Sequence, residues 1–368
     1  MSQLFSPLTL GALRLKNRIV IAPMCQYSAS DGHADDWHLQ HLGNLAMSGA
    51  GLLIIEATAV EPVGRITPGD LGLWSDETEA SLARVITAVH RYSAMPLAIQ
   101  LAHAGRKASA AVPWEGGLQL STAQGGWQTL APSALPFATE DSAPVALDED
   151  DLQRILEAFV TAAQRAYRLG LDAIEIHAAH GYLLHEFLSP ISNIRTDQYG
   201  GTLENRLRFP LRGFETVRKA VPENLPIGIR ISATDWLDGG WDLQQSIVLA
   251  KALEERGCAF IHVSSGGLSP SQQIPLAPHY QVPLAEAIRN AAGLPTIAVG
   301  LINEPEAAEA IIAEGRADMV GLARGILYNP RWPWHAAAKL GATVDAPPQY
   351  WRSLPYGSSP FFTDARIH

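Results

Sequence analysis

The feature that most constrains the fold is an alternation, repeated eight times, between a short apolar run and a longer segment with helical spacing. The runs that we predict to be strands are Ile19–Met24, Gly51–Thr58, Pro96–Leu101, Ala173–His177, Pro226–Ile231, Phe260–Ser264, Thr296–Val299 and Ala317–Gly321. The segments that we predict to be helices are Trp37–Met47, Asp76–Tyr92, Asp148–Leu169, Leu203–Ala220, Leu243–Arg256, Tyr280–Ala292, Glu304–Glu314 and Ile326–Leu340. Continuous apolar runs are typical of parallel strands covered on both faces. The alternation therefore predicts an α/β fold, a single (β/α)8 TIM barrel.

The helix predicted over Asp148–Leu169 shows the local signals most clearly. Asp148 is a favourable N-cap, and acidic residues fill the first turn, where the helix dipole favours negative charge. Apolar residues from Leu152 to Phe159 fall on one stripe, and Gly170 is placed to end the helix.

A doubly wound sheet is the alternative fold, but it would show a glycine-rich turn directly after the first strand. Here the segment from Pro23 to Tyr27 follows that strand instead. Two long excursions, 103–146 and 265–279, follow strands, so in a barrel they are insertions over the C-terminal mouth, where active sites form. We predict a barrel over residues 1–340 and a C-terminal arm over 341–368 that could reach a neighbouring subunit.

Composition excludes several classes of protein. The 368 residues carry a formal charge of −10, which argues against a nucleic-acid surface. The two cysteines, Cys25 and Cys258, are too few for a disulfide scaffold, an all-cysteine zinc site or a four-cysteine iron–sulfur cluster. No signal-peptide pattern and no apolar run near the ~18 residues of a membrane span is present. We expect a soluble cytoplasmic protein with no nucleic-acid or membrane partner.

Polar side chains stand at the ends of the predicted strands, where burial is tolerated only with a hydrogen-bond partner or a ligand. They are Cys25, Glu56, Gln100, His103, His177, His180, Arg230, Ser264, Ser265, Gly300 (a backbone position) and Arg324.

The most informative strand end is the segment from Glu175 to Tyr182. His177 and His180 could donate two hydrogen bonds to one oxygen, and Tyr182 could then supply a proton. The alternatives are two histidines satisfied by backbone carbonyls, or a zinc site that would also need acidic ligands, for which Glu56 is the obvious candidate. We predict no metal.

Three further positions suggest an anionic ligand or a cofactor. Arg230 either pairs with a carboxylate or faces an anion. Gly300 and the run Gly321–Arg324 follow the last two strands, where barrels bind phosphate, although a plain helix start is the alternative. Cys25 is a packing residue, a reactive thiol or a cofactor contact, whereas we assign Cys258 to the core.

Five motifs together resemble the Old Yellow Enzyme family of flavin ene-reductases. They are Ala22-Pro-Met-Cys-Gln-Tyr27, Glu56-Ala-Thr58, Gln100-Leu-Ala-His-Ala-Gly-Arg-Lys107, His177-Ala-Ala-His-Gly-Tyr182 and Arg195-Thr-Asp-Gln-Tyr-Gly-Gly-Thr-Leu-Glu-Asn-Arg206. The combination of Cys25, Tyr27 and Lys107 is similar to the thermophilic-like branch, which includes the xenobiotic reductases.

The resemblance implies non-covalent FMN, reduced by NADPH or NADH, and reduction of the C=C bond of α,β-unsaturated carbonyl or nitro compounds. The implied cofactor contacts are Ala22, Pro23, Met24, Cys25, Ala57, Gln100, Arg230, Gly300, Ala323 and Arg324. The implied substrate contacts are Tyr27, His177, His180, Tyr182 and Trp351, the last from a neighbouring subunit of a homodimer or homotetramer. His177 and His180 would grip the substrate oxygen, with Tyr182 as the proton donor.

The sequence departs from the family pattern at Ala323, where glycine is expected, and in a tail that is longer than expected. Two other functions are weighed against this one. Larger relatives that act on dienoyl thioesters carry an iron–sulfur cluster and extra domains, for which this chain has neither the cysteines nor the length. A non-catalytic flavin- or phenol-binding protein is the other alternative.

Overall fold

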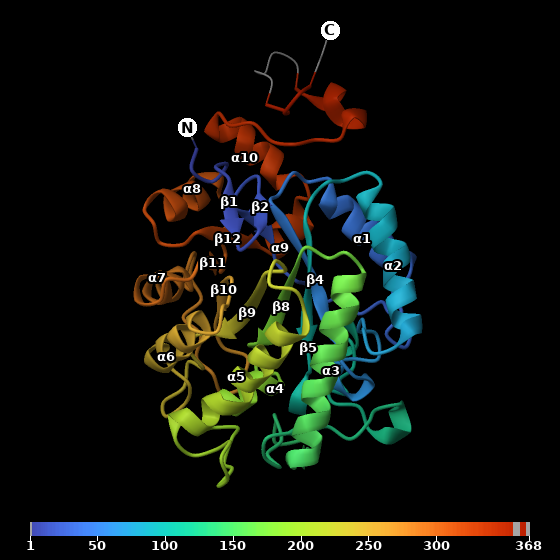
Figure 1. Cartoon of the computed structure of the whole chain (residues 1–368), viewed down its shortest axis with the longest axis vertical. Helices are drawn as coiled ribbons and strands as arrows, with labels where there is room; N and C mark the ends of the chain where they lie inside the picture. The colour runs from blue at the N-terminus through green and yellow to red at the C-terminus, as the bar shows by residue number, and fades with distance from the viewer. Residues whose placement is uncertain (1, 356–360, 366–368) are drawn as a thin grey trace.

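The computed structural model describes residues 2–355 and 361–365. Parallel strands close into a barrel in the order β10-β11-β12-β3-β4-β5-β8-β9, which confirms the predicted TIM barrel (Figure 1). The barrel strands are β3 (Ile19–Ile21), β4 (Leu52–Ala59), β5 (Leu97–Ala102), β8 (Ala173–Ala178), β9 (Ile227–Ser232), β10 (Ile261–Ser264), β11 (Thr296–Ala298) and β12 (Met319–Leu322).

The helices follow the strands as predicted over most of the chain. They are α1 (Asp36–Ala46), α2 (Asp76–His90), α3 (Glu149–Arg168), α5 (Leu203–Ala220), α6 (Leu243–Glu254), α7 (Val282–Ala291) and α8 (Pro305–Ala313). Asp148 caps α3 by accepting the Asp151 backbone N–H at 2.9 Å, and Gly170 follows its end with φ of +73°. Both local predictions for this helix are therefore confirmed.

The prediction of one helix over Ile326–Leu340 is wrong. The segment forms two helices, α9 (Arg324–Tyr328) and α10 (Trp332–Leu340). Asn329 separates them with a ψ of 85°, outside the helical region. The residue before a proline is disfavoured in the helical region, and Pro330 imposes that restriction here.

Several short elements lie outside the predicted alternation. They are the strands β1 (Leu8–Leu10), β2 (Leu13–Leu15), β6 (Leu130–Ala131) and β7 (Val145–Ala146), the helix α4 (Leu183–Leu188), and the 3-10 helices η1 (Pro62–Gly64), η2 (Gly105–Lys107), η3 (Pro113–Glu115), η4 (Thr122–Gln124) and η5 (Pro348–Ser353). Their lengths are below what hydrophobic periodicity can detect.

The hairpin of β1 and β2 covers the N-terminal end of the barrel. Leu10 and Leu15 are fully buried in one apolar cluster with Val20, Leu52 and Phe260. Val20 lies on β3, Leu52 lies on β4, and Phe260 directly precedes β10. Figure 1 shows this hairpin at the upper end of the molecule, beside α10 and the C-terminal segment, with long insertion loops at the opposite end. The mouth of the barrel therefore faces away from the hairpin.

The C-terminal arm packs back onto the last helix. Trp334 of α10 contacts Phe362, with 4.8 Å between ring centroids, and Val344 bridges to Phe362 in parallel. Residues 356–360 and 366–368 of the predicted arm lie outside the described residues. The division into a barrel and an arm stays a prediction.

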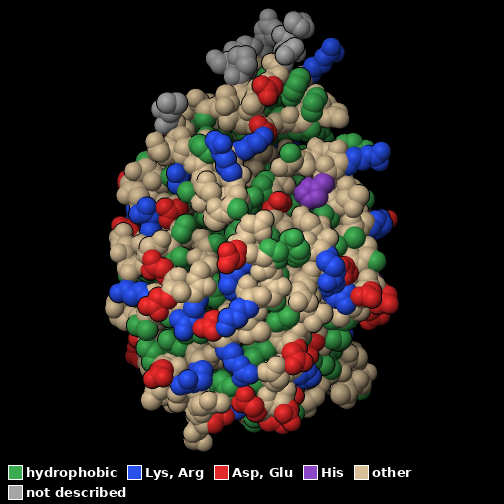
Figure 2. Space-filling model, viewed as in Figure 1, with side chains coloured by type: hydrophobic (Ala, Val, Ile, Leu, Met, Phe, Trp, Pro, Cys, Tyr) green, Lys and Arg blue, Asp and Glu red, His purple; other side chains and the backbone are tan. Residues whose placement is uncertain are grey.

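The surface mixes charges of both signs. Acidic and basic side chains alternate over the face shown in Figure 2, so the net charge of −10 does not form a single-sign patch there. No helix among residues 2–355 and 361–365 is long and apolar enough to cross a membrane.

Candidate active site

The ends of β8 and β9 bring His177 and Arg230 to the same level of the barrel mouth. The two residues are register partners in adjacent parallel strands. Because side chains alternate along a strand, partners in register point to the same side of the sheet. Both are buried, with 3% and 9% of their surface exposed. The structure thus places an imidazole and a guanidinium side by side, inside the barrel.

His177, His180 and Tyr182 form one cluster. The His177 ring centroid lies 5.2 Å from that of His180 and 5.0 Å from that of Tyr182, both in edge-on geometry. The Ala179 backbone N–H donates to His177 Nδ1 at 3.3 Å, which leaves the proton on Nε2. His180 Nε2 lies 2.8 Å from the Ser264 hydroxyl. The partners recorded for both rings are an amide and a hydroxyl, not the backbone carbonyls of the alternative interpretation.

Burial sets the protonation states in this cluster. It lowers the pKa of His177 and of His180 well below the ordinary value, and the positive charge of Arg230 lowers both further. Burial also raises the pKa of Tyr182, helped by Cys25 and Tyr27. Both imidazoles are therefore neutral, each with one N–H to donate, and the tyrosine keeps its proton.

The loop that carries these residues is held by polar side chains. Lys107 Nζ donates to the His180 carbonyl at 2.8 Å and to the Gly267 carbonyl at 2.9 Å. The His180 N–H donates to Ser232 Oγ at 2.9 Å, and the Gly181 N–H donates to His185 Nδ1 at 2.9 Å. These bonds fix His180 at φ of +59°, a left-handed conformation that costs a non-glycine residue free energy.

Sequence reasoning found Lys107 only through the family resemblance and missed Ser232 and His185. A signal existed for Ser232, because it stands two residues after Arg230 and so faces the same side of β9. His185 gave no such signal, since α4 is too short to detect. Burial lowers the pKa of Lys107 to about 8.

Arg230 fits an anionic ligand. No carboxylate of the described residues lies within ion-pair distance of it, which answers the alternative of a structural pair, and its Nε atom has no hydrogen-bond partner. A buried, unpartnered cation is costly unless something fills the space beside it. The electron-rich edge of a flavin ring is a group that this cation would stabilise.

The predicted phosphate residues meet at one edge of the mouth. Gly300 follows β11, and Ala323 and Arg324 follow β12, its hydrogen-bonded neighbour. Gly300 has φ of +114°, and a Cβ there would lie 3.0 Å from Gln281 Nε2. Arg324 is exposed, so its guanidinium is accessible to a phosphate. A backbone cradle with an accessible arginine suits the phosphate of FMN.

The first two strands supply the remaining predicted cofactor residues. Ala22, Pro23, Met24 and Cys25 directly follow β3, and Ala57 of β4 pairs with Gln100 of β5. Burial raises the pKa of Cys25, so its sulfur stays a neutral thiol rather than a nucleophilic thiolate. Cys258 is buried in the core, as predicted.

Two strand-end residues of the sequence analysis belong to supporting contacts. Glu56 accepts the Gln26 backbone N–H at 2.8 Å, next to the loop of Tyr27. His103 Nε2 lies 2.9 Å from Glu61 Oε1. Neither approaches the His177 cluster by any recorded hydrogen bond or ion pair.

Tyr27 borders a cavity at the mouth. The cavity measures about 210 Å³, and Lys107, Leu118 and Phe137 from the long insertion also line it. The Tyr27 ring stacks edge-on with Trp114, with 5.9 Å between centroids. The insertion over residues 103–146 therefore forms part of the wall of this cavity.

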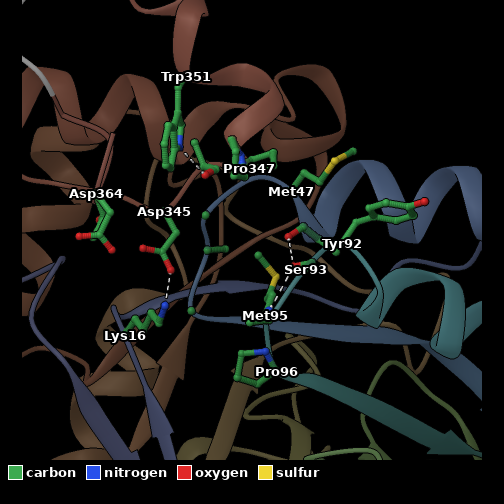
Figure 3. A pocket seen from close by; sticks show the side chains of 18 residues that line it. Lys16, Met47, Tyr92, Ser93, Met95, Pro96, Asp345, Pro347, Trp351 and Asp364 are labelled. Atoms are coloured by element: carbon green, nitrogen blue, oxygen red, sulfur yellow. Dashed lines mark hydrogen bonds and ion pairs between the residues drawn. The ribbon is translucent and has the colours of Figure 1, made fainter. Parts of the chain in front are cut away.

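Trp351 lies at the other end of the barrel. Its indole N–H donates to the Ala346 carbonyl at 3.0 Å. It lines a separate cavity of about 290 Å³ with Lys16 and Pro96, which precede β3 and β5 (Figure 3). The structure does not bring Trp351 to the site of its own chain, so only the contribution to a neighbouring subunit stays as a prediction.

Comparison with known proteins identifies the family. The family model for the NADH:flavin oxidoreductase / NADH oxidase family matches residues 3–342. The chain belongs to this family. It is 45% identical to an NADPH dehydrogenase of Listeria innocua over 357 residues, 96% of this chain and 99% of that protein. The family resemblance and FMN as the cofactor are thereby confirmed, with a reduced nicotinamide as the electron source.

Solved structures of two reductases share the fold of this member of the family. Morphinone reductase in complex with tetrahydroNAD is 32% identical, with a TM-score of 0.74 over 99% of this chain and 95% of that one. 2-Naphthoyl-CoA reductase is 25% identical, with a TM-score of 0.82 over 92% of this chain. This chain covers 52% of that longer protein. The family, the barrel and an Old Yellow Enzyme-type oxidoreductase activity are therefore established.

Proposed function

We propose that this oxidoreductase reduces the C=C bond of α,β-unsaturated carbonyl or nitro compounds. The observation that carries the proposal is the cluster of two neutral imidazoles and a protonated tyrosine beside the buried guanidinium of Arg230. His177 and His180 can share one substrate oxygen, and Tyr182 stands next to them as an acid.

The chain's own residues would act as follows. When bound, FMN supplies the hydride that it has received from a reduced nicotinamide. His177 and His180 donate hydrogen bonds to the carbonyl or nitro oxygen, where negative charge develops as the β-carbon is reduced. Tyr182 gives its phenolic proton to the α-carbon, so that a hydride and a proton together saturate the double bond.

For the cofactor we propose three sets of contacts. The backbone from Ala22 to Cys25, with Ala57 and Gln100, would lie against the ring. Arg230 would stabilise the negative charge that reduction leaves on the ring, because its guanidinium is buried and its Nε has no partner in the part of the chain that the structure describes. Gly300, Ala323 and Arg324 would hold the phosphate. The Cys25 thiol would tune the flavin rather than attack substrate.

The cavity beside Tyr27 would be the substrate pocket, because Lys107 lines it and also donates to the carbonyl of His180. The cavity beside Tyr27 has aromatic and aliphatic walls with the Lys107 ammonium at one side, which suits a small apolar molecule with one polar oxygen. Tyr27 would be a second contact to that oxygen. We propose NADPH as the reductant, since the relative from Listeria carries the name NADPH dehydrogenase.

We further propose a cytoplasmic homodimer or homotetramer in which the arm carries Trp351 toward a neighbouring site. Trp351 lies away from the site of its own chain, and both cysteines are free thiols, as in a reducing compartment. Sedimentation analysis with and without residues 341–368 tests the assembly.

An anaerobic spectrum tests the activity directly. The purified protein is expected to be yellow, to bleach when NADPH is added, and to recover its colour when cyclohexenone follows. A protein that takes up no FMN would contradict the cofactor placement. A protein that bleaches but is not reoxidised by any enone or nitroalkene would contradict the substrate class.

A further inference from the structure

A buried carboxylate lies inside the barrel, one layer below the catalytic cluster. Glu175 stands two residues before His177 on β8 and is fully buried. Its Oε1 accepts the Gln100 side-chain amide at 2.7 Å, and its Oε2 lies 2.7 Å from His262 Nδ1. The three side chains come from β8, β5 and β10, and none of the three is more than 2% exposed.

This cluster fixes the orientation of Gln100. A carboxylate only accepts hydrogen bonds, so Gln100 must turn its NH2 group, not its carbonyl oxygen, toward Glu175. Without Glu175 the two ends of the amide would be equivalent in shape, and the side chain could present either. The carboxylate therefore determines which amide group Gln100 keeps for other contacts.

The cluster also fixes His262. Because Nδ1 donates to Glu175, the neutral ring leaves Nε2 as an acceptor, and that buried atom has no partner among the described residues. A Cβ on Gly321 would lie 3.3 Å from Nε2, so the glycine keeps the space beside the ring open. Burial lowers the pKa of His262, which keeps the ring uncharged.

The negative charge of Glu175 also offsets the positive charge of Arg230. Its charge raises the pKa of Arg230, opposing the larger effect of burial, although the two do not touch. His262 and Arg230 are register partners, so the carboxylate cluster and the guanidinium occupy adjacent strands. The negative charge that reduction leaves on a ring beside Arg230 is therefore stabilised less than it would be by the guanidinium without Glu175.

We infer that Glu175 is a positioning residue for the flavin site, where it orients Gln100 and lowers the flavin reduction potential by offsetting the charge of Arg230. The inference rests on the proposed position of FMN at the barrel mouth. Glu175 would then affect both the affinity for FMN and the reduction potential of the flavin, whereas a purely structural residue would affect folding alone.

The test compares Glu175→Gln with Glu175→Asp in the FMN-loaded protein. Loss of the charge in E175Q is expected to strengthen the binding of reduced FMN relative to oxidised FMN at least tenfold. For a two-electron couple this corresponds to a rise of about 30 mV in the reduction potential of the flavin. Glu175→Asp keeps the charge but is one methylene shorter, so the potential is expected to stay and the FMN dissociation constant to rise about tenfold. Asp318→Asn is the matched control with an unchanged potential, because it removes a carboxylate that is paired with Arg289 just before β12, at the N-terminal end of the barrel.

Potentials come from anaerobic dye titration and affinities from fluorescence of released FMN. An unchanged potential in E175Q, or an equal shift in D318N, overturns the charge effect. If E175Q does not fold, an unchanged FMN affinity in E175D overturns the positioning role. Wild-type protein that takes up no FMN would instead contradict the proposed function, so the two failures are distinct.

Discussion

The two ends of the barrel interior are built from the same strands but differ in chemistry. At the N-terminal end, Leu10 and Leu15 of the hairpin pack on Phe260 with no surface exposed. At the mouth, His177 and Arg230 are also buried, yet Arg230 Nε has no partner in the described structure. The side chains at the apolar end pack against one another, whereas the polar end keeps a hydrogen-bond donor without a partner among the described residues. Stability and chemistry are therefore separated along one axis.

Removal of both imidazoles is expected to have the largest effect at the polar end. His177→Ala combined with His180→Ala should lower steady-state turnover of cyclohexenone about 1000-fold, because two donors to the substrate oxygen are lost. FMN should remain bound, as shown by the visible spectrum. His335→Ala, on the exposed side of α10, is the control. Unchanged turnover would refute the role of the pair and with it the contrast between the two ends.

A truncation at the apolar end should act on stability alone. Leu10→Ala removes a fully buried side chain and is expected to lower the free energy of unfolding by about 3 kcal/mol. Chemical denaturation measures this, and turnover of the folded protein should stay at the wild-type value. Leu276→Ala, at a 70% exposed leucine, should change stability by less than about 0.5 kcal/mol. A loss of turnover in Leu10→Ala would show that the ends are coupled.

Tyr182→Phe separates proton transfer from hydride transfer at the mouth. Reduction of the flavin by NADPH should keep its rate, while reoxidation by an enone should slow about 100-fold because the proton donor is missing. Stopped-flow absorbance follows the two half-reactions separately. Tyr328→Phe, at a 93% exposed tyrosine, is the matched control. Equal slowing of both half-reactions would point to a displaced cofactor instead.

Cys25→Ser should have a smaller effect. The neutral thiol is proposed to tune the flavin, so its replacement should shift the midpoint potential by about 30 mV, a tenfold change for a two-electron couple. Activity should remain measurable. Complete inactivity with FMN still bound would mean that Cys25 takes part in the chemistry.

The binding of cyclohexenone should not depend on pH between pH 6 and 7.5. Burial and Arg230 lower the pKa of His177 and His180, so both rings are already neutral at pH 7 and stay neutral as the pH falls toward 6. The dissociation constant of cyclohexenone, which does not ionise, should therefore be constant between pH 6 and 7.5. A change centred near pH 6.5 would indicate an imidazole with its ordinary pKa and a wetter site.

Much of the fold could be predicted because its signals are local. Each barrel strand is a continuous apolar run, and Asp148 and Gly170 mark the ends of one helix through capping and backbone conformation. The break at Asn329 could also have been read from Pro330, and the prediction of one continuous helix gave that proline too little weight. The hairpin of β1 and β2 was missed because each strand has only three residues.

The candidate site was predictable where polar residues end apolar strands, as His177 and Arg230 do. It was not predictable where its parts are joined across the chain. Lys107 meets the His180 carbonyl, and Glu175 meets Gln100 and His262, only because closure of the barrel sets these strands side by side. Trp351 shows the reverse case, since the packing of the arm puts it at the far end from the site of its own chain.

The sequence by itself determined the barrel, the polar mouth and the family, because apolar periodicity and strand-end chemistry are written in consecutive residues. Only the tertiary structure decided which polar groups pair and which remain unpartnered. Pairing depends on the register between strands far apart in the chain, and burial then sets the charge of each group. That is why two features are identified only in the folded protein: the Nε of Arg230 has no partner among the described residues, and Glu175 is the charge that offsets the guanidinium.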